Sequence, residues 1–271
     1  MPWSKIKNII LVILAVTNLA LLVLVGGQAI RGSRLLSQAR EDAIQFLRNR
    51  GVEVDEEIVP QSMELRPQIV ERDLAGEERA AAALLGSPVT AESRGGEVYR
   101  YFNEKGSVQF HSDSTFSAQL EEGAFPLGGS RRESCLELMG KMGFQGVVLS
   151  EEGDELVFRQ TWKGNPLFSQ QVTLVCQGGN LTAMTSGRQL AGRPQEDAAR
   201  ESITVATALI GFLNGVSALG DVCNRIDMIE PGYVAAASLS GPIVLTPVWR
   251  ITTDTGAYQL DTVTGGVTRV S

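Results

Sequence analysis

Side chains that could support catalysis are few in this sequence and widely spaced. The chain has one histidine, His111, with Asp113 two residues later, and their spacing assigns no nucleophile to the pair. Ser4 and Lys7 have S-x-x-K spacing, but they lie in a short tail beside an apolar segment. Motifs of the G-x-S-x-G, H-E-x-x-H and C-x-x-C types do not occur. Without these motifs the sequence predicts no enzyme and no cofactor site. It also predicts no metal site, because one histidine cannot supply a multi-histidine centre.

Three cysteines, Cys135, Cys176 and Cys223, are the remaining reactive groups. Buried free thiols behave as small hydrophobic side chains, whereas an oxidising compartment favours disulfides. The number is odd, so at least one thiol would stay free if a pair bridged. The sequence does not choose between three free thiols and one of the possible pairs.

Charge and composition limit the class of partner. There are 24 basic and 31 acidic residues, so the net charge is −7. This balance argues against nucleic acid as the main partner, since phosphate binding needs an excess of basic side chains. Hydrophobic residues make up 43% of the chain and charged residues 20%, which is typical of a folded protein.

An uncharged segment near the N-terminus predicts a membrane anchor over residues 9–27. Seventeen residues from Ile9 to Val25 carry no charge, and a helix of about twenty apolar residues crosses a bilayer. The rival interpretation is a cleaved signal peptide, with small residues at Gly27 and Ala29. Lys5 and Lys7 in the 1–8 tail favour a cytoplasmic N-terminus and an extracytoplasmic C-terminal domain.

One face of the predicted anchor carries a polar residue, Asn18, near the middle of the span. An amide there is stabilised by a hydrogen bond to another helix, which predicts a contact with a partner inside the membrane. The alternative is an Asn that is tolerated facing lipid. The predicted contact face consists of Leu11, Leu14, Asn18, Leu21, Leu22 and Val25.

The rest of the chain predicts an α+β fold in which helices precede antiparallel strands. We expect a juxtamembrane helix over 28–51, an α+β lobe over 52–130, and a C-terminal region over 131–271 that contains two helix-plus-antiparallel-sheet repeats, about 131–190 and 196–271. The last helix is expected to begin near Glu196. Residues 203–220 carry no charge, but their Thr, Asn, Ser and Gly content favours a buried helix over a second span.

Three aromatic residues of the predicted strands are candidates for contact with another protein in the ectodomain. They are Trp162, Phe168 and Trp249. Core packing is the ordinary role of strand aromatics, and exposure on a partner surface is the alternative.

Three segments resemble a known family. The opening MPWSKIKNIILVILAVTNLALL resembles the N-terminus of the YycI regulators of low-GC Gram-positive bacteria. The segment WKGNPLFSQQVTL (Trp162 to Leu174) resembles a strand pair of the YycH/YycI superfamily. The ending PVWRITTDTGAYQLDTVTGGV (Pro247 to Val267) resembles the closing hairpin of that family and of PepSY-like modules.

The resemblance implies a single-pass protein of the cell membrane with a PepSY-like ectodomain. It would bind a YycH-like partner and regulate the sensor histidine kinase of a cell-wall two-component system, with the Asn18 face as the kinase contact. An alternative function is a PepSY-like inhibitor or folding helper of a secreted peptidase, which would need the ectodomain alone. The signal, the sign of regulation and the stoichiometry do not follow from the sequence.

Overall fold

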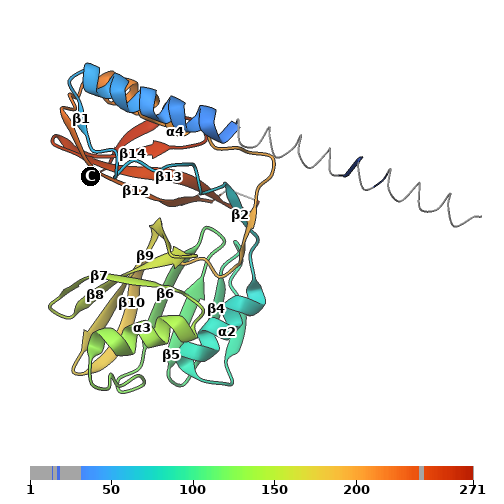
Figure 1. Ribbon diagram of the computed structural model, residues 1–271. Coiled ribbons are helices and arrows are strands. Elements are labelled where there is room, and N and C mark those ends of the chain that lie inside the picture. The colour runs from blue at the N-terminus through green and yellow to red at the C-terminus, as the bar shows by residue number, and fades with distance from the viewer. Residues whose placement is uncertain (1–13, 15–16, 19–31, 238–240, 271) are drawn as a thin grey trace, which may run out of the picture.

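The computed structural model describes residues 14, 17–18, 32–237 and 241–270. The chain forms two lobes, each with paired strands and covering helices, and a parallel strand pairing at Leu167 and Tyr233 joins the strands of the two lobes (Figure 1). The end lobe contains residues 32–70 and 194–270, from both ends of the described chain, and the middle lobe contains residues 71–193. The observed architecture is mixed α+β, as the helix-then-strand pattern predicts.

The middle lobe consists of two units, each a helix followed by a four-stranded antiparallel meander. The first unit is α2 (Leu74–Leu85), β3 (Thr90–Ser93), β4 (Tyr99–Asn103), β5 (Gly106–Phe110) and β6 (Thr115–Leu120). The second is α3 (Arg131–Lys141), β7 (Gly146–Glu152), β8 (Glu155–Trp162), β9 (Asn165–Gln177) and β10 (Asn180–Arg188). Their last strands, β6 and β10, pair antiparallel and make one continuous sheet.

The end lobe contains a third unit of the same kind, completed by the N-terminal part of the chain. This unit is α4 (Val205–Ala218), β12 (Arg225–Ala236), β13 (Ile243–Thr253), β14 (Gly256–Asp261) and β15 (Val267–Val270). β1 (Glu53–Val54) pairs parallel with β12, while β2 (Gln68–Val70) pairs with β13 and β11 (Pro194–Glu196) with β2. A first helix, residues 32–49, lies beside α4 on the outer side of the sheet (Figure 1).

Side-chain caps set where the helices start. The side chains of Asp73, Ser130 and Thr204 accept hydrogen bonds from backbone N–H groups in the first turns of α2, α3 and α4. Gly86 ends α2 with a φ of 84°, a conformation that glycine adopts without strain.

Several expected elements differ from the structure. The helix expected near Glu196 begins at Val205, because residues 194–196 pair as β11 and Thr204 supplies the cap. The alternation of residues over 52–60 predicts a strand, but only Glu53–Val54 forms one. The carbonyls of Glu56, Val59 and Pro60 instead accept hydrogen bonds from Arg40. Within 203–220 the helix is Val205–Ala218, and it buries one face against the end-lobe sheet.

The sequence predicts a boundary at residue 130, whereas the observed middle lobe extends from residue 71 to residue 193. Strands of the expected 52–130 lobe and of the expected 131–190 repeat share one sheet, because β6 and β10 expose complementary backbone edges to each other. Within the expected 196–271 repeat, α4 and strands β12 to β15 share a core that the first helix and β1 complete. Residues 28–31 of the expected juxtamembrane helix lie outside the described residues, and helix is present over 32–49.

Candidate functional site at the lobe junction

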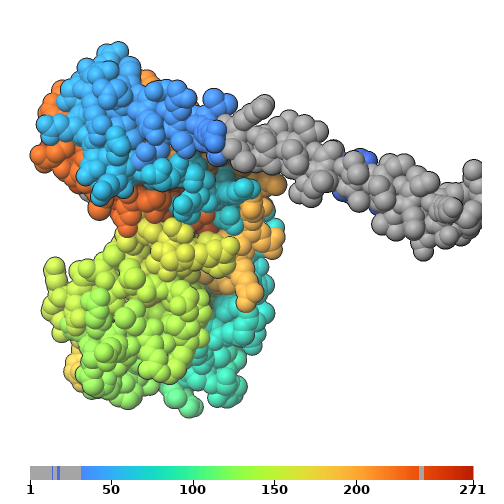
Figure 2. Space-filling view, viewed as in Figure 1, coloured from blue at the N-terminus to red at the C-terminus, as the bar shows by residue number. Residues whose placement is uncertain are grey.

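Two chain segments cross between the lobes and form the centre of the junction. One is residues 70–73, from the end of β2 to the start of α2, and the other is residues 190–194, which lead from β10 into the first residue of β11. They run so close together that a Cβ on Gly192 would lie 2.1 Å from the carbonyl oxygen of Glu71. Figure 2 shows the two lobes joined at this narrower waist.

The parallel β9–β12 pairing, a small apolar cluster and a few polar contacts hold the junction together. The cluster contains Val70, Leu167, Leu190, Tyr233, Ala235 and Leu245, and Trp162 packs against it. The buried Gln160 side chain donates to the Leu190 carbonyl at 3.2 Å and accepts from the Leu190 N–H at 3.0 Å. These two bonds fasten the 190–194 crossing to the middle lobe.

Two cavities of opposite charge flank the 190–192 segment. The acidic cavity, of about 420 Å³, is lined by Glu71, Asp73, Glu77 and Glu97 among others, with Arg72 and His111. The basic cavity, of about 340 Å³, is lined by Arg79, Lys141, Arg193 and Trp162 among others, with Asp73 as its acidic group. Both volumes are within the range of ligand sites.

An ion pair organises the acidic cavity. Arg72 Nε lies 2.7 Å from Glu77 Oε1, and the Glu77 side chain is only 4% exposed. The Arg72 guanidinium also donates to the carbonyls of Glu97 and Phe110 and lies over the Tyr99 ring. These contacts join the start of α2 to the β3–β4 and β5–β6 loops, so the pair has a structural role.

His111 lies half-buried in the wall of the acidic cavity. Asp113, its neighbour in sequence, accepts a hydrogen bond from the Thr115 N–H at 2.8 Å, which closes the local turn. Among the residues that the structure describes, no hydrogen bond joins the His111 and Asp113 side chains. Ser4 and Lys7 lie outside the described residues.

The three aromatic candidates have different environments. Trp162 is half-buried in the wall of the basic cavity, and Lys163 Nζ lies 5.6 Å from its ring centre. Phe168 and Trp249 are only 4% and 3% exposed. The structure therefore gives Phe168 and Trp249 the ordinary core role of strand aromatics, and neither side chain lies on a surface that a partner could contact.

Phe168 is part of the contact between the lobes. Its ring fills the space above Gly232, where a Cβ would lie 2.5 Å from Phe168 Cε2, and the Arg250 guanidinium lies 4.2 Å from the ring centre. Burial lowers the pKa of Arg250, and the nearby Arg159 lowers it further. Arg159 of the middle lobe also pairs with Glu230 of the end lobe at 3.6 Å.

The expected anchor contacts fall largely on undescribed positions. Leu14 and Asn18 are helical and exposed, whereas Leu11, Leu21, Leu22 and Val25 lie outside the described residues. Within the described part of the chain, no helix has the length and apolar content needed to cross a membrane. Most of the predicted anchor over 9–27 is outside that part.

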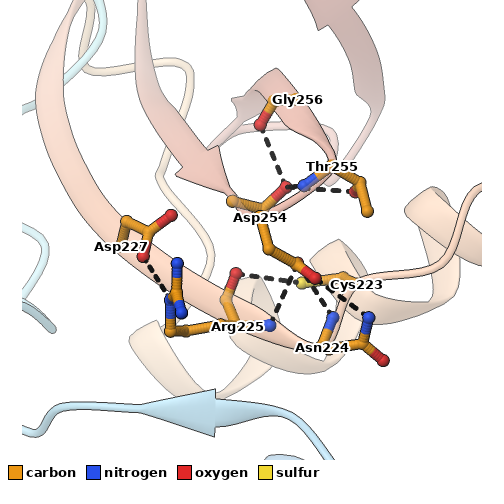
Figure 3. A network of polar contacts seen from close by, with 8 residues as sticks. Cys223, Asn224, Arg225, Asp227, Asp254, Thr255 and Gly256 are labelled. Atoms are coloured by element: carbon orange, nitrogen blue, oxygen red, sulfur yellow. Dashed lines mark hydrogen bonds and ion pairs between the residues drawn. The ribbon is translucent and has the colours of Figure 1, made fainter.

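A polar network that the sequence did not indicate fixes the opposite end of the end lobe (Figure 3). The Asp254 carboxylate, in the β13–β14 turn, accepts from the Asn224 N–H at 3.0 Å, from the Asn224 side chain at 2.9 Å and from the Arg225 N–H at 3.1 Å. The hydrogen bond from the Asn224 side chain lowers the pKa of Asp254 most. Thr255 donates to the Val222 carbonyl at 2.7 Å, so the turn is bound to the α4–β12 loop.

Metal-binding side chains do not converge among the described residues. No three His, Cys, Asp or Glu side chains in this part of the chain are placed to hold a metal ion together.

Comparisons with known proteins identify similar structures of low sequence identity. No family model and no curated protein matches the sequence. An uncharacterized protein from Eubacterium rectale ATCC 33656 has a TM-score of 0.40 and 11% identity, over 78% of this chain and 87% of that chain. The Bacillus megaterium YpeB C-terminal domain has a TM-score of 0.37 and 11% identity, over 74% of this chain and 99% of that domain. These values leave family and activity open.

Proposed function

We propose that this protein is a membrane-tethered, non-enzymatic regulator that acts by binding other proteins. Residues 9–27 would anchor it in the cell membrane with the N-terminus in the cytoplasm, and both lobes would lie outside. The proposed partners are the sensor histidine kinase of a cell-wall two-component system and a YycH-like protein. The basis for naming these partners is the sequence resemblance of three segments.

The observation that carries the proposal is the way the first helix is built into the end lobe. Ala43, Ile44 and Leu47 are buried against α4 and the sheet. Arg40, only 5% exposed, donates to the carbonyls of Glu56, Val59 and Pro60 at 2.6, 2.9 and 3.1 Å. A helix fixed in this way moves with its lobe, so a shift of a tether attached to it would be transmitted to the whole domain.

The basic cavity is the proposed contact for an acidic segment of the partner. Residues 35–271 contain 20 basic and 31 acidic side chains, a net charge of −11. Against this background Arg79, Lys141 and Arg193 line one cavity together with the half-buried Trp162. Aromatic and arginine side chains in a pocket are typical of the residues that contribute most to protein binding.

Regulation would follow from unequal affinity for two states of the kinase. A protein that binds one state better shifts the equilibrium toward it, without chemistry of its own. Contacts in the bilayer through the Asn18 face and contacts at the basic cavity would both contribute to this difference.

Co-purification of the full-length chain with the kinase from membranes tests the proposal. Trp162→Ala should reduce recovery of the kinase by at least about tenfold, because a central aromatic contact contributes roughly 2 kcal/mol. Val222→Ala is the matched control, since Val222 is 65% exposed at the opposite end of the end lobe. Kinase recovery that stays at the level of the unaltered chain with both Trp162→Ala and Arg193→Glu would contradict the proposed contact.

Two further variants test the tether. Asn18→Leu should weaken kinase recovery if the amide contacts another helix in the membrane. A chain that lacks residues 1–34 should lose regulation entirely. Full regulatory activity of that shortened chain would favour an inhibitor of a secreted peptidase, which needs the ectodomain alone.

A further inference from the structure

Two of the three cysteines meet in the core of the middle lobe. Cys135 lies on α3 and is fully buried, and Cys176 lies near the end of β9 and is 5% exposed. Their sulfur atoms are 3.9 Å apart, although 41 positions separate them in the sequence. Cys223 is in the end lobe, where its thiol faces the Arg225 carbonyl at 3.7 Å.

We propose that Cys135 and Cys176 form an intramolecular disulfide when the chain meets a disulfide-containing oxidant, and that Cys223 remains a thiol. The sulfurs must approach by a little under ~2 Å to reach the disulfide bond length of about 2.05 Å. The bond would join the helix layer of the middle lobe to its sheet. The extracytoplasmic location proposed above would supply such an oxidant, but the pairing itself follows from the geometry.

The surroundings indicate which sulfur reacts first. The hydrogen bond from the Cys135 thiol lowers the pKa of Cys176, and the Arg131 guanidinium lowers it further. The same hydrogen bond, together with burial, raises the pKa of Cys135. Because the thiolate is the nucleophile, Cys176 is the attacking group and Cys135 the resolving group. Cys176 is also the more exposed of the two.

The reaction is a two-step thiol–disulfide exchange. The Cys176 thiolate attacks one sulfur of a small disulfide, R–S–S–R, forming a mixed disulfide and releasing RS⁻. Cys135 then gives its proton to a solvent base and attacks Cys176 Sγ, which releases the second RS⁻. Two protein thiols lose two electrons and two protons, and the donor is reduced to two molecules of RSH.

The test uses the full-length chain with Cys223→Ser, in detergent, incubated with oxidised glutathione. We expect the intact mass to fall by two hydrogen atoms, a non-reducing peptide map to join residues 135 and 176, and both thiols to resist alkylation after denaturation. The melting temperature should rise by roughly 5–10 °C, since the bond closes a loop of about forty residues. Circular dichroism of the reduced protein checks that Cys223→Ser leaves the fold unchanged.

Cys135→Ser provides the matched control for the order of attack. It should stop at a mixed disulfide between Cys176 and glutathione, whereas Cys176→Ser should react far more slowly. The proposal would be overturned if both cysteines of the folded Cys223→Ser protein stayed reduced. A stable glutathione adduct on that protein, without a bridge, would overturn it equally.

Discussion

The two lobes are built from the same helix-plus-meander unit but are closed in different ways. The middle lobe is a contiguous stretch of chain, residues 71–193, in which two units pair through β6 and β10. The end lobe has one such unit and takes the rest of its core from the first helix, including Ile44 and Leu47. The core packing of the end lobe therefore fixes the first helix, to which the proposed tether would be attached.

The two lobes should differ most in whether a fragment of each one folds by itself. A fragment of residues 71–193 should unfold cooperatively by itself, because its 22-residue apolar core lies entirely within that segment. A fragment of residues 194–271 should lack fixed tertiary structure, since it loses the side chains of the first helix and β1. Near-ultraviolet circular dichroism with thermal melting distinguishes the two outcomes. Cooperative melting of the 194–271 fragment would contradict this account of the end lobe.

Arg40→Met should destabilise the end lobe selectively. The substitution leaves three carbonyls without their charged donor, and we expect a loss of about 3 kcal/mol in the free energy of unfolding. Hydrogen exchange should speed up in residues 32–60 and in α4 while α2 and α3 remain protected. Arg48→Met is the control and should cost less, because the Arg48–Glu56 pair is exposed and Arg48 donates to one backbone carbonyl, that of Val54, where Arg40 donates to three. Equal losses in the free energy of unfolding for Arg40→Met and Arg48→Met would contradict a special role of the three buried hydrogen bonds of Arg40.

Gln160→Leu should loosen the junction while leaving both lobe cores intact. It removes the two hydrogen bonds to Leu190 and leaves a buried N–H and C=O unpaired, which costs about 2 kcal/mol. Faster hydrogen exchange should be confined to the 190–194 crossing. The neighbouring exposed Gln145, which also lines the basic cavity, offers a control as Gln145→Leu. A uniform loss of protection across the middle lobe would show that Gln160 supports the core instead.

The smallest expected effect comes from the Asp254 network and depends on pH. The folded-state pKa of Asp254 is lowered, so its stabilising contribution is complete above the unfolded value near 3.9 and is lost as pH falls below it. Asp254→Asn should lower the melting temperature by a few degrees at pH 7, and this difference should shrink as the pH is lowered and Asp254 takes up a proton. A melting difference that did not shrink in acid would mean that the carboxylate charge is not what holds the turn.

The local patterns in the sequence predict most helices and several strands. Apolar spacing closed by Gly51 and by Gly86 predicts helices over 33–51 and 73–86, and the structure has helices at 32–49 and at Leu74–Leu85. The Lys105-Gly106 turn predicts a hairpin over 98–110, where β4 and β5 pair. Short strands such as β2 and β11 have no such signal, because three residues are too few to show a period. The division into lobes was missed for a different reason, since nothing in β6 or β10 alone specifies that their edges meet.

At the candidate site, too, local patterns are predictable from the sequence and contacts between distant segments are not. Trp162 was singled out as a strand aromatic, and the structure places it in a cavity wall. The burial of Phe168 could not be foreseen, because it depends on Gly232 of a strand more than sixty residues away and on the Arg250 guanidinium. Neither the basic cavity nor the Cys135–Cys176 contact follows from spacing, since each brings together distant segments.

Photo-crosslinking in living cells of the native host tests the central claim most directly. A photoreactive amino acid replaces Trp162 in the full-length chain, and the control places it at the exposed position of Val222. The account predicts a covalent adduct with the sensor histidine kinase from position 162 and little or none from position 222. Absence of a kinase adduct at 162, or equal adducts at the two positions, would contradict it.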